Sequence, residues 1–355
     1  MKQIAILPTS KEYLNNALFD LGSYLNRDNL LSFWNFLQTY AQNHGLDIQT
    51  IDRCSNPSGF WALDINPQLI SKLSKENLSQ AILFCVESPT VLSRAYRPKN
   101  LIYLKKHANR VFHYNKDLCK QYGFEHMIWH TDVYSKHETN ITNFKSRKGV
   151  CLIATQKWSH ASTGDLNFRL KSAQRLAEIY PDEFKIYGFQ WNCRVGFLRN
   201  PLPRIFTKNR LINRLLLEFE KKIPAHQSVQ NVYMGPIKSK GDALKHFRAN
   251  IIFENTFLAG YLCEKIFDAI QYGCIPIYYG DPDASELIPE NIFLYGPHFS
   301  CPEEAVEKVL RMSDKEGQQM IDAGQAWLYS PDFEEKFGQK AQAHKICTLL
   351  KELVA

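Results

Sequence analysis

Short apolar runs alternate with amphipathic segments twice along the chain, and this alternation constrains the fold more than any other feature. In the first half, the apolar runs are Ile4–Leu7, Leu46–Ile51, Ala81–Val86 and Arg110–Tyr114. In the second half, they are Val150–Ala154, Phe184–Tyr187, Ala249–Phe253 and Ile275–Tyr279. Runs of this length are typical of buried parallel strands. The strand–helix–strand order therefore predicts a parallel α/β sheet in each half.

The segments between the runs predict helices. Asp28 is expected to cap a helix that ends at Gly45 and contains, at helical spacing, Leu30, Leu31, Trp34, Leu37 and Tyr40. Further helices are expected over residues 167–179 and 260–272. A last helical pattern, within residues 335–355, predicts a C-terminal helix that is free to pack back across the domains.

A polar stretch over residues 135–148 separates the two halves. We therefore expect two Rossmann-like domains that face a cleft. The first comprises residues 1–147 and the second residues 148–334, followed by the helix of residues 335–355.

The apolar content and the cysteines exclude several classes of protein. The longest apolar runs, at residues 81–86 and 274–279, are far shorter than the ~18 residues of a membrane span. The amino terminus becomes polar too early for a signal peptide, so a cytoplasmic protein is expected. Nine cysteines without a C-x-x-C pair indicate neither a zinc ribbon nor a dithiol, and we expect reduced, mostly buried thiols.

The formal net charge of +7 indicates an anionic partner. Its densest region, residues 194–214, holds six basic residues and no acidic one. A solvated face, a diphosphate ligand, an anionic membrane surface and nucleic acid all fit such a stretch. The chain has no RNA- or DNA-binding signature, so nucleic acid is not expected as a partner. Peripheral association with the inner face of a membrane stays open, and no pattern sets an oligomeric state.

The most informative segment, residues 251–282, has the pattern of one β-α-β unit. Leu262, Ile266 and Ile270 recur every four residues and predict a buried helix stripe. Gly273 stands where a left-handed residue ends such a helix.

Five polar or aromatic residues gather at one predicted edge of this unit. They are Glu254, Asn255, Tyr261, Glu264 and Lys265, at the carboxyl end of one strand and the start of the next helix. Ligands of open parallel sheets bind at that edge, and a helix amino terminus favours phosphate. The next strand is expected to bring Tyr278, Tyr279 and Asp281 nearby. Each of these residues alone is explained by an ordinary helix charge or strand-end position. Together, however, they predict a site for a phosphate-bearing ligand.

Two motifs of this segment resemble a known family. The pattern F-E-N-x(5)-Y-x-x-E-K-I-x-D-A, at Phe253–Ala269, and G-x-x-P-I-Y-Y-G-D-P, at Gly273–Pro282, resemble the donor-binding signature of the α1,3/4-fucosyltransferases. Tyr187-Gly188 and residues 234–247 resemble flanking parts of the same family, so the likeness covers about residues 150–290. It implies two Rossmann-like domains of GT-B type, inverting transfer and GDP-fucose as the donor substrate.

The resemblance also implies roles for individual residues. Asn167-Phe-Arg-Leu-Lys171 corresponds to the segment that carries a diphosphate-binding arginine, which points to Arg169. Asn255, Tyr261, Glu264 and Lys265 match donor-contacting positions, and Glu254 and Tyr187 belong to the same donor-binding set. Glu87 in Val86-Glu-Ser-Pro89 resembles the carboxylate that serves as catalytic base.

Inverting transfer requires three contributions from these residues. Glu87 is expected to take the proton of the attacking hydroxyl as the new bond forms. Arg169 and Lys265 are expected to stabilise the departing diphosphate. Glu264 is expected either to hold sugar or ribose hydroxyls or to face the positive charge that develops on the fucosyl ring.

Metal binding is not expected. Asp281-Pro-Asp283 has the form of a D-x-D triplet, but proline separates its aspartates in a turn-rich loop, and the resemblance implies a fold that needs no divalent ion. His126 and His130 have H-x-x-x-H spacing without the glutamate of a zinc-protease motif.

The acceptor is less constrained. Residues 96–117 lack an arginine–aspartate pattern that many family members carry, which leaves the acceptor and linkage open. We expect a GlcNAc-containing or related glycan and α1,3 linkage. Two alternatives are the same fold with another GDP-linked deoxysugar, and a non-catalytic binder of an anionic polymer.

Overall fold

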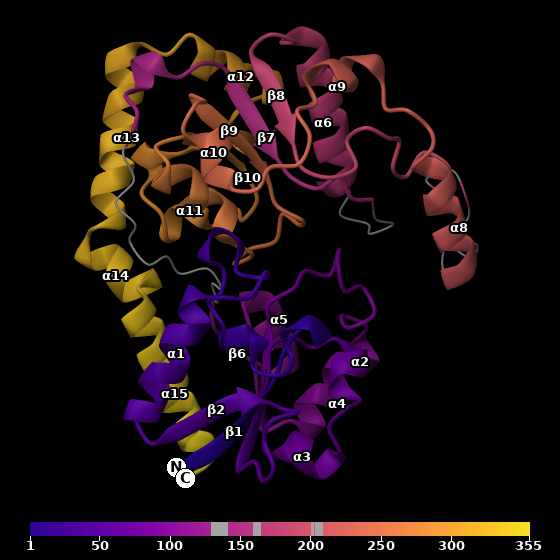
Figure 1. The fold of residues 1–355 in the computed structure, drawn as a ribbon, viewed down its shortest axis with the longest axis vertical. Coiled ribbons are helices and arrows are strands. Elements are labelled where there is room, and N and C mark those ends of the chain that lie inside the picture. The colour runs from indigo at the N-terminus through magenta and orange to yellow at the C-terminus, as the bar shows by residue number, and fades with distance from the viewer. Residues whose placement is uncertain (129–140, 159–164, 200–201, 203–208) are drawn as a thin grey trace.

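The computed structural model describes residues 1–128, 141–158, 165–199, 202 and 209–355. These residues form two α/β domains, one above the other in Figure 1. Each domain has a wholly parallel sheet, which confirms the expected fold class.

The first sheet has the strand order β2-β1-β3-β4-β5-β6 among the described residues. Its strands are β1 (Lys2–Leu7), β2 (Leu46–Thr50), β3 (Gly59–Ala62), β4 (Ala81–Cys85), β5 (Arg110–His113) and β6 (Glu125–His126). The second sheet has the order β11-β10-β9-β7-β8. Its strands are β7 (Val150–Ile153), β8 (Phe184–Tyr187), β9 (Ala249–Phe253), β10 (Ile275–Tyr279) and β11 (Leu294–Tyr295).

Helices connect and cover these strands. In the first domain they are α1 (Ser32–Asn43), α2 (Pro67–Ile70), α3 (Lys75–Ser79), α4 (Pro98–His107) and α5 (Lys116–Tyr122). In the second domain they are α6 (Asp165–Ile179), α8 (Arg210–Glu220), α9 (Gln227–Val232), α10 (Lys240–Leu244), α11 (Glu264–Gln271), α12 (Pro302–Leu310), α13 (Asp314–Leu328) and α14 (Pro331–Phe337). The last helix is α15 (Gln339–Leu353).

All eight predicted apolar runs form strands, but the predicted start of the first helix is wrong. Asp28 has a φ of 49° inside a short 3-10 segment, and α1 begins four residues later at Ser32. The Asp28 carboxylate instead accepts a hydrogen bond from the Lys240 backbone N–H of the other domain at 3.3 Å. Asp28 therefore links the two domains rather than capping a helix.

The helix of the β-α-β unit is shorter than predicted. Residues 260–263 form a loop, and α11 begins at Glu264. Gly273 does end the unit's helical region in the left-handed conformation, with a φ of 64°. The start of α11 thus falls on Glu264 and Lys265, which places both at the amino terminus of the helix.

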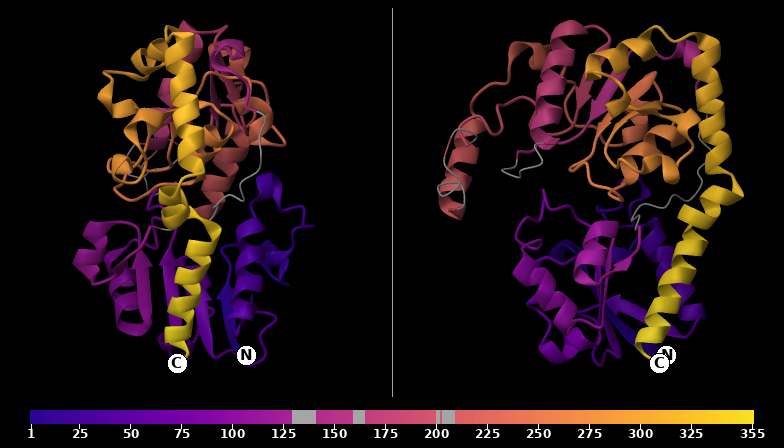
Figure 2. Two further views of the ribbon diagram at one scale, coloured as in Figure 1. Left: turned by 90° about the vertical axis from the view of Figure 1, so that its left-hand side faces the viewer. Right: turned by 180° about the vertical axis from the view of Figure 1, so that it is seen from behind.

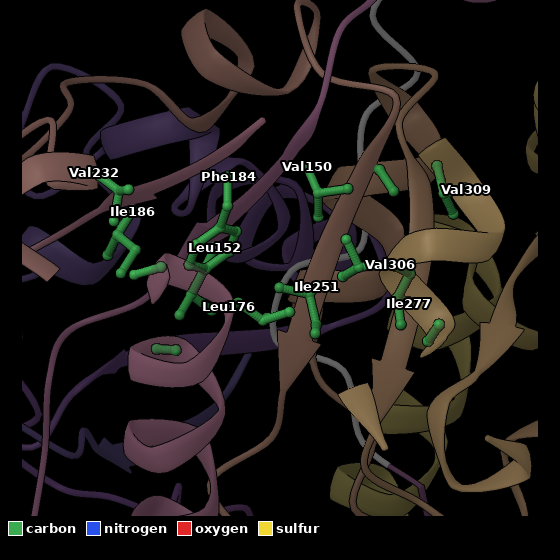
Figure 3. Packing of buried hydrophobic residues seen from close by; sticks show 14 of the residues in the cluster. Val150, Leu152, Leu176, Phe184, Ile186, Val232, Ile251, Ile277, Val306 and Val309 are labelled. Carbon is green, nitrogen blue, oxygen red and sulfur yellow. The ribbon is translucent and has the colours of Figure 1, made fainter. Parts of the chain in front are cut away.

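The second core fills the space between β7, β8, β9, β10 and the helices around them (Figure 3). Leu152, Leu176, Ile251 and Ile277 pack together in this core. Phe144 is fully buried in the same core, so packing of the second domain begins before β7. Buried cover on both faces is what a parallel sheet requires.

The end of the chain returns to the first domain. Helices α13, α14 and α15 run along the side of the molecule, and both termini lie together at the far end of the first domain (Figure 2). Ile346 and Leu350 of α15 join the core beside α1 and β4. The chain therefore passes between the domains twice.

The nine cysteines are free, and six of them are buried, as expected. Within the described ranges, no helix is long and apolar enough to cross a bilayer.

Candidate active site

A cavity of about 640 Å³ lies between the domains, and both contribute side chains to it. From the first domain come Tyr13, Arg27, Asp28, Trp34 and Glu87. From the second come Lys157, Arg169, Lys238, Lys240, Asn255, Tyr261, Glu264, Lys265 and Asp268. Its charged lining has six basic side chains and four acidic ones, which favours an anionic ligand.

The loop between β9 and α11 builds one wall of this cavity around Lys265. The Lys265 Nζ lies 2.8 Å from Oε2 of Glu254, a fully buried carboxylate directly after β9. Burial acts to lower the pKa of Lys265, but Cys263, Glu254 and Glu264 raise it well above its ordinary value. Lys265 is therefore held as a cation at the cavity wall.

Glu264 precedes this lysine and remains ionised. Burial acts to raise its pKa, but Lys265 and Lys240 lower it well below the ordinary value. Lys240 also lies 2.6 Å from Asp268, one turn further along α11. Cys263 precedes α11 without a side-chain hydrogen bond to its first amides. Positive charge and backbone N–H groups thus meet at this helix terminus.

Arg169 reaches the cavity from α6 and is almost fully buried. Its Nη2 donates a hydrogen bond to the Thr155 carbonyl at 3.0 Å. Burial lowers the pKa of Arg169 to about 10, an effect that the Glu254 charge opposes. No ion pair joins Arg169 to a carboxylate among the described residues, so its guanidinium is available to an anionic ligand.

Glu87 follows β4 and lines the cavity from the first domain. Its Oε2 is buried without a hydrogen-bond partner among the described residues. Burial raises the pKa of Glu87, and Lys157 and Lys265 act against that rise. A desolvated carboxylate near the cations of the opposite domain is suited to accepting a proton.

A second carboxyl group lies next to Glu87. Asp64 is buried just after β3 and accepts a hydrogen bond from the Ile65 backbone N–H at 2.7 Å. Burial, with a smaller contribution from Glu87, raises the pKa of Asp64 to about 8. Asp64 is therefore protonated at neutral pH, which spares Glu87 a second negative charge beside it.

Tyrosines connect Glu87 with the donor-side loop. The Tyr96 hydroxyl donates to the Glu87 carbonyl at 2.5 Å and lies 3.3 Å from the Tyr114 hydroxyl. The Tyr114 and Tyr261 rings meet edge to face with their centroids 5.3 Å apart. Gly260, with a φ of 81°, lets this loop approach so closely that a Cβ would lie 2.1 Å from the Tyr114 carbonyl oxygen.

Two residues predicted to bind the donor have other surroundings. Tyr187 packs against Phe247 with ring centroids 6.0 Å apart, and its neighbours Gly188 and Phe189 line the cavity instead. Glu254 is fully buried and contacts Lys265 and Cys263, so it can influence a ligand only through these two residues. Direct donor contact by Tyr187 or Glu254 is not supported by this geometry.

The expected contribution of β10 to the cavity is wrong. Tyr278 and Tyr279 are buried in the sheet, and the Tyr279 ring stacks on Phe253 at 4.9 Å. Asp281 is buried, and its Oδ1 accepts hydrogen bonds from the Gly260 and Asp283 backbone N–H groups, each at 2.9 Å. Asp281 therefore supports the loop around Gly260, and the Tyr278 hydroxyl accepts a hydrogen bond from the Asp281 backbone N–H at 3.2 Å.

No group of three or more potential metal ligands occurs in the ranges that the structure describes. The Asp281 contacts explain the D-x-D triplet as a loop support. His126 Nε2 lies 3.0 Å from the Tyr114 carbonyl oxygen, whereas His130 lies outside the described residues.

Sequence reasoning missed three residues that shape this site. Asp64 follows β3, the one strand of the first five along the chain that was not among the predicted apolar runs. Lys240 is far from α11 in sequence, and only the fold brings it to Glu264 at 3.4 Å. Lys157, in an irregular segment after β7, carries no spacing signal.

Two facing α/β domains with a cavity between them form the fold of GT-B glycosyltransferases. A crystal structure of an α1,3-fucosyltransferase with GDP aligns over 99% of this chain and 90% of its own, with a TM-score of 0.55 at 13% identity. A DNA-modifying β-glucosyltransferase aligns over 99% of both chains, with a TM-score of 0.53 at 11% identity. These likenesses establish the fold.

The family model for the C-terminal part of glycosyltransferase family 10, the fucosyltransferases, matches residues 217–355 and confirms the resemblance read from Phe253–Pro282. An α-(1,3)-fucosyltransferase of Helicobacter pylori is 34% identical over 82 residues, 23% of this chain and 17% of its own. An α-(1,4)-fucosyltransferase of Arabidopsis thaliana is 31% identical over 72 residues, 20% of this chain and 18% of its own. The chain thus matches less than a fifth of the length of either relative.

Proposed function

We propose that this protein is an inverting glycosyltransferase that moves L-fucose from GDP-fucose to a hydroxyl group of a glycan. The positions of Glu87 and Lys265 on opposite walls of one cavity carry this proposal. The donor is proposed from the family match and from the crystal structure of an α1,3-fucosyltransferase with GDP-fucose.

In this proposal, the diphosphate lies at the amino terminus of α11. Lys265 and Arg169 neutralise the charge that grows on GDP as the bond to fucose breaks. Arg169 can bind two phosphate oxygens at once, a geometry that lysine lacks. Asn255 and Tyr261 complete the donor side of the cavity.

Glu87 acts as the general base on the opposite side. The acceptor oxygen forms a bond to the anomeric carbon of fucose while the bond from that carbon to the β-phosphate oxygen breaks. The hydroxyl proton passes to Glu87, and GDP leaves with the bonding electron pair. The raised pKa of Glu87 makes it a stronger base than an exposed glutamate.

Glu264 serves the donor sugar as an anion. Its lowered pKa keeps the carboxylate ionised, so it accepts hydrogen bonds from sugar or ribose hydroxyls. The same charge can face the positive charge that develops on the fucosyl ring. We propose that no divalent ion takes part, because Arg169 and Lys265 supply the cations that phosphate needs.

We further propose a GlcNAc-containing glycan as acceptor, α1,3 linkage and a place on the cytoplasmic side of the cell. The nine free cysteines support a reducing compartment. Tyr13, a half-buried aromatic residue, lines the cavity from the domain that carries Glu87 and suits contact with a sugar face.

The decisive experiment incubates the protein with GDP-fucose and an array of GlcNAc-containing glycans, with EDTA present, and detects products by mass spectrometry. We expect a mass gain of one deoxyhexose and GDP release, both lost in Glu87→Gln. Turnover of a different GDP-deoxysugar in place of GDP-fucose would reassign the donor. Tight binding of an anionic polymer without turnover of any sugar nucleotide would contradict the catalytic proposal.

A further inference from the structure

Helix α8 projects from the second domain and lies apart from both sheets (Figures 1 and 2). In the part of the chain that the structure describes, none of the four apolar clusters includes a side chain of α8. Its sequence, Arg-Leu-Ile-Asn-Arg-Leu-Leu-Leu-Glu-Phe-Glu, is nevertheless amphipathic, with six large apolar residues among eleven. Packing in these cores therefore does not account for the apolar side chains of α8.

The helix is firmly attached at its carboxyl end. The buried Glu220 carboxylate accepts hydrogen bonds from the backbone N–H groups of Gly196, Leu198 and Arg199 at 2.8–3.0 Å. It also pairs with the Arg199 guanidinium at 2.7 Å. At the other end, the Asn209 side chain accepts hydrogen bonds from the Leu211 and Ile212 N–H groups. The structure thus presents α8 as a formed, anchored element.

One face of α8 exposes an apolar stripe. Leu211, Leu215 and Phe219 recur every four residues and are 72%, 55% and 60% exposed. Phe197, on the loop that Glu220 holds, is 54% exposed. A gathered set of exposed large apolar side chains marks an interaction surface, whereas scattered ones are ordinary.

Basic residues surround this stripe. The Arg194 guanidinium lies over the Phe197 ring at 5.3 Å, and Lys222 Nζ lies 5.9 Å from the centre of the Phe219 ring. Arg214 is exposed between Leu211 and Leu215. Lys221 and Lys222, directly after the helix, are exposed as well.

We propose that α8 with Phe197, here named the α8 surface, docks on an anionic membrane surface. Leucine and phenylalanine side chains enter the boundary between headgroups and acyl chains, and the flanking arginines and lysines bind anionic headgroups. A second copy of this chain is disfavoured, because two such surfaces would bring like charges together. Nucleic acid is also disfavoured, because it would neutralise the basic residues but leave the apolar stripe exposed to water. This proposal goes beyond the proposed function and is measured without turnover, so either can fail alone.

The test is flotation of the purified full chain with phosphatidylcholine vesicles that contain about 30% phosphatidylglycerol, against pure phosphatidylcholine vesicles. We expect the protein to float with the anionic vesicles and to dissociate as salt is raised. The double variant Leu211→Gln/Leu215→Gln should lose at least about tenfold in partitioning. The matched control Ile102→Gln removes a side chain of similar exposure, 59%, from α4 in the other domain and should bind as the parent does.

Circular dichroism and thermal melting of each variant separate a binding defect from unfolding. The proposal is overturned if the parent does not float, or if the folded double variant floats equally well. It is also overturned if sedimentation shows a dimer that Leu211→Gln/Leu215→Gln dissociates, because a second copy then covers the stripe.

Discussion

The Glu254 carboxylate lies 2.8 Å from the Lys265 ammonium, yet of this pair only Lys265 lines the cavity between the domains. Glu254 is fully buried after β9 and also contacts the Cys263 thiol. The charge that faces a ligand is therefore fixed from behind by a carboxylate that the ligand does not touch.

Replacing Glu254 by glutamine should destabilise the protein. Loss of the buried partner leaves Lys265 with an incompletely compensated charge, at a cost of about 3 kcal/mol in the free energy of unfolding. Urea denaturation gives this value directly. In the control, Glu316→Gln breaks the exposed pair with Lys308, and such pairs contribute about 0–1 kcal/mol. Equal losses in both variants would argue against a special role for Glu254.

Replacing Arg169 or Lys265 by alanine should weaken GDP binding, because each supplies a cation to the proposed diphosphate site. Charge-assisted hydrogen bonds contribute about 1.5–3 kcal/mol each, so we expect a loss of at least about tenfold in affinity by calorimetry. Lys171→Ala is the matched control, since Lys171 lies on α6 with its side chain exposed. Unchanged affinity in both site variants would show that the diphosphate binds elsewhere.

Glu87→Gln should leave GDP affinity nearly intact and lower transfer roughly a hundredfold or more, the usual effect of losing a general base. Its pKa is raised by burial, and only the deprotonated form accepts the proton. The transfer rate of the parent should therefore fall as the pH is lowered through a pKa above the usual glutamate range. A folded Glu87→Gln variant with parental turnover would assign the base to another residue.

Asp64 predicts a pH-dependent stability. Burial raises its pKa from 3.8 to about 8, so the folded state holds a proton that the unfolded state releases above pH 4. The free energy of unfolding should therefore fall as the pH rises from about 4 to about 8, by up to about 1.4 kcal/mol for each pH unit. In Asp64→Asn, this contribution should disappear. Parallel pH profiles of the parent and the variant would refute this assignment.

Gly260→Ala should disturb the contact between the domains. A methyl group there would meet the Tyr114 carbonyl oxygen at 2.1 Å, in addition to straining a φ of 81°. Gly45→Ala is an informative control, because Gly45 has a φ of 84° with nothing within 4 Å of its Cβ position. Both variants should lose roughly 1 kcal/mol of stability from backbone strain. Only Gly260→Ala should also raise the KM for the donor and alter the small-angle scattering profile.

Local sequence patterns predicted the strands and several site residues, whereas other contacts became visible only in the tertiary structure. Buried strands such as Ala81–Val86 are visible because their whole length is apolar, and Gly273 because a helix end there needs a left-handed residue. Glu87 and Lys265 could be placed at strand and helix ends, whose position in a parallel sheet is fixed by topology.

Other features depend on contacts between distant segments. Asp28 looks like a helix cap, but its partner is Lys240, more than 200 residues away. Asp281 resembles a metal ligand, and its real contacts are the backbone N–H groups of its own loop and of Gly260. No spacing rule reports such pairs. The contact of Tyr187 with Phe247 likewise joins residues 60 positions apart in the sequence.

Because α15 packs on the first domain, the two domains cannot be separated by a single cut of the chain. Residues 217–355 match one family model, yet Ile346 and Leu350 complete the hydrophobic interior that begins with β1. If the chain were cut in the polar stretch between the domains, the second fragment would carry α15 with its apolar side exposed. The first fragment would lack the helix that covers its core beside α1 and β4. Each half needs the packing surface of the other, so we expect both to fold only as one polypeptide or when they are co-expressed.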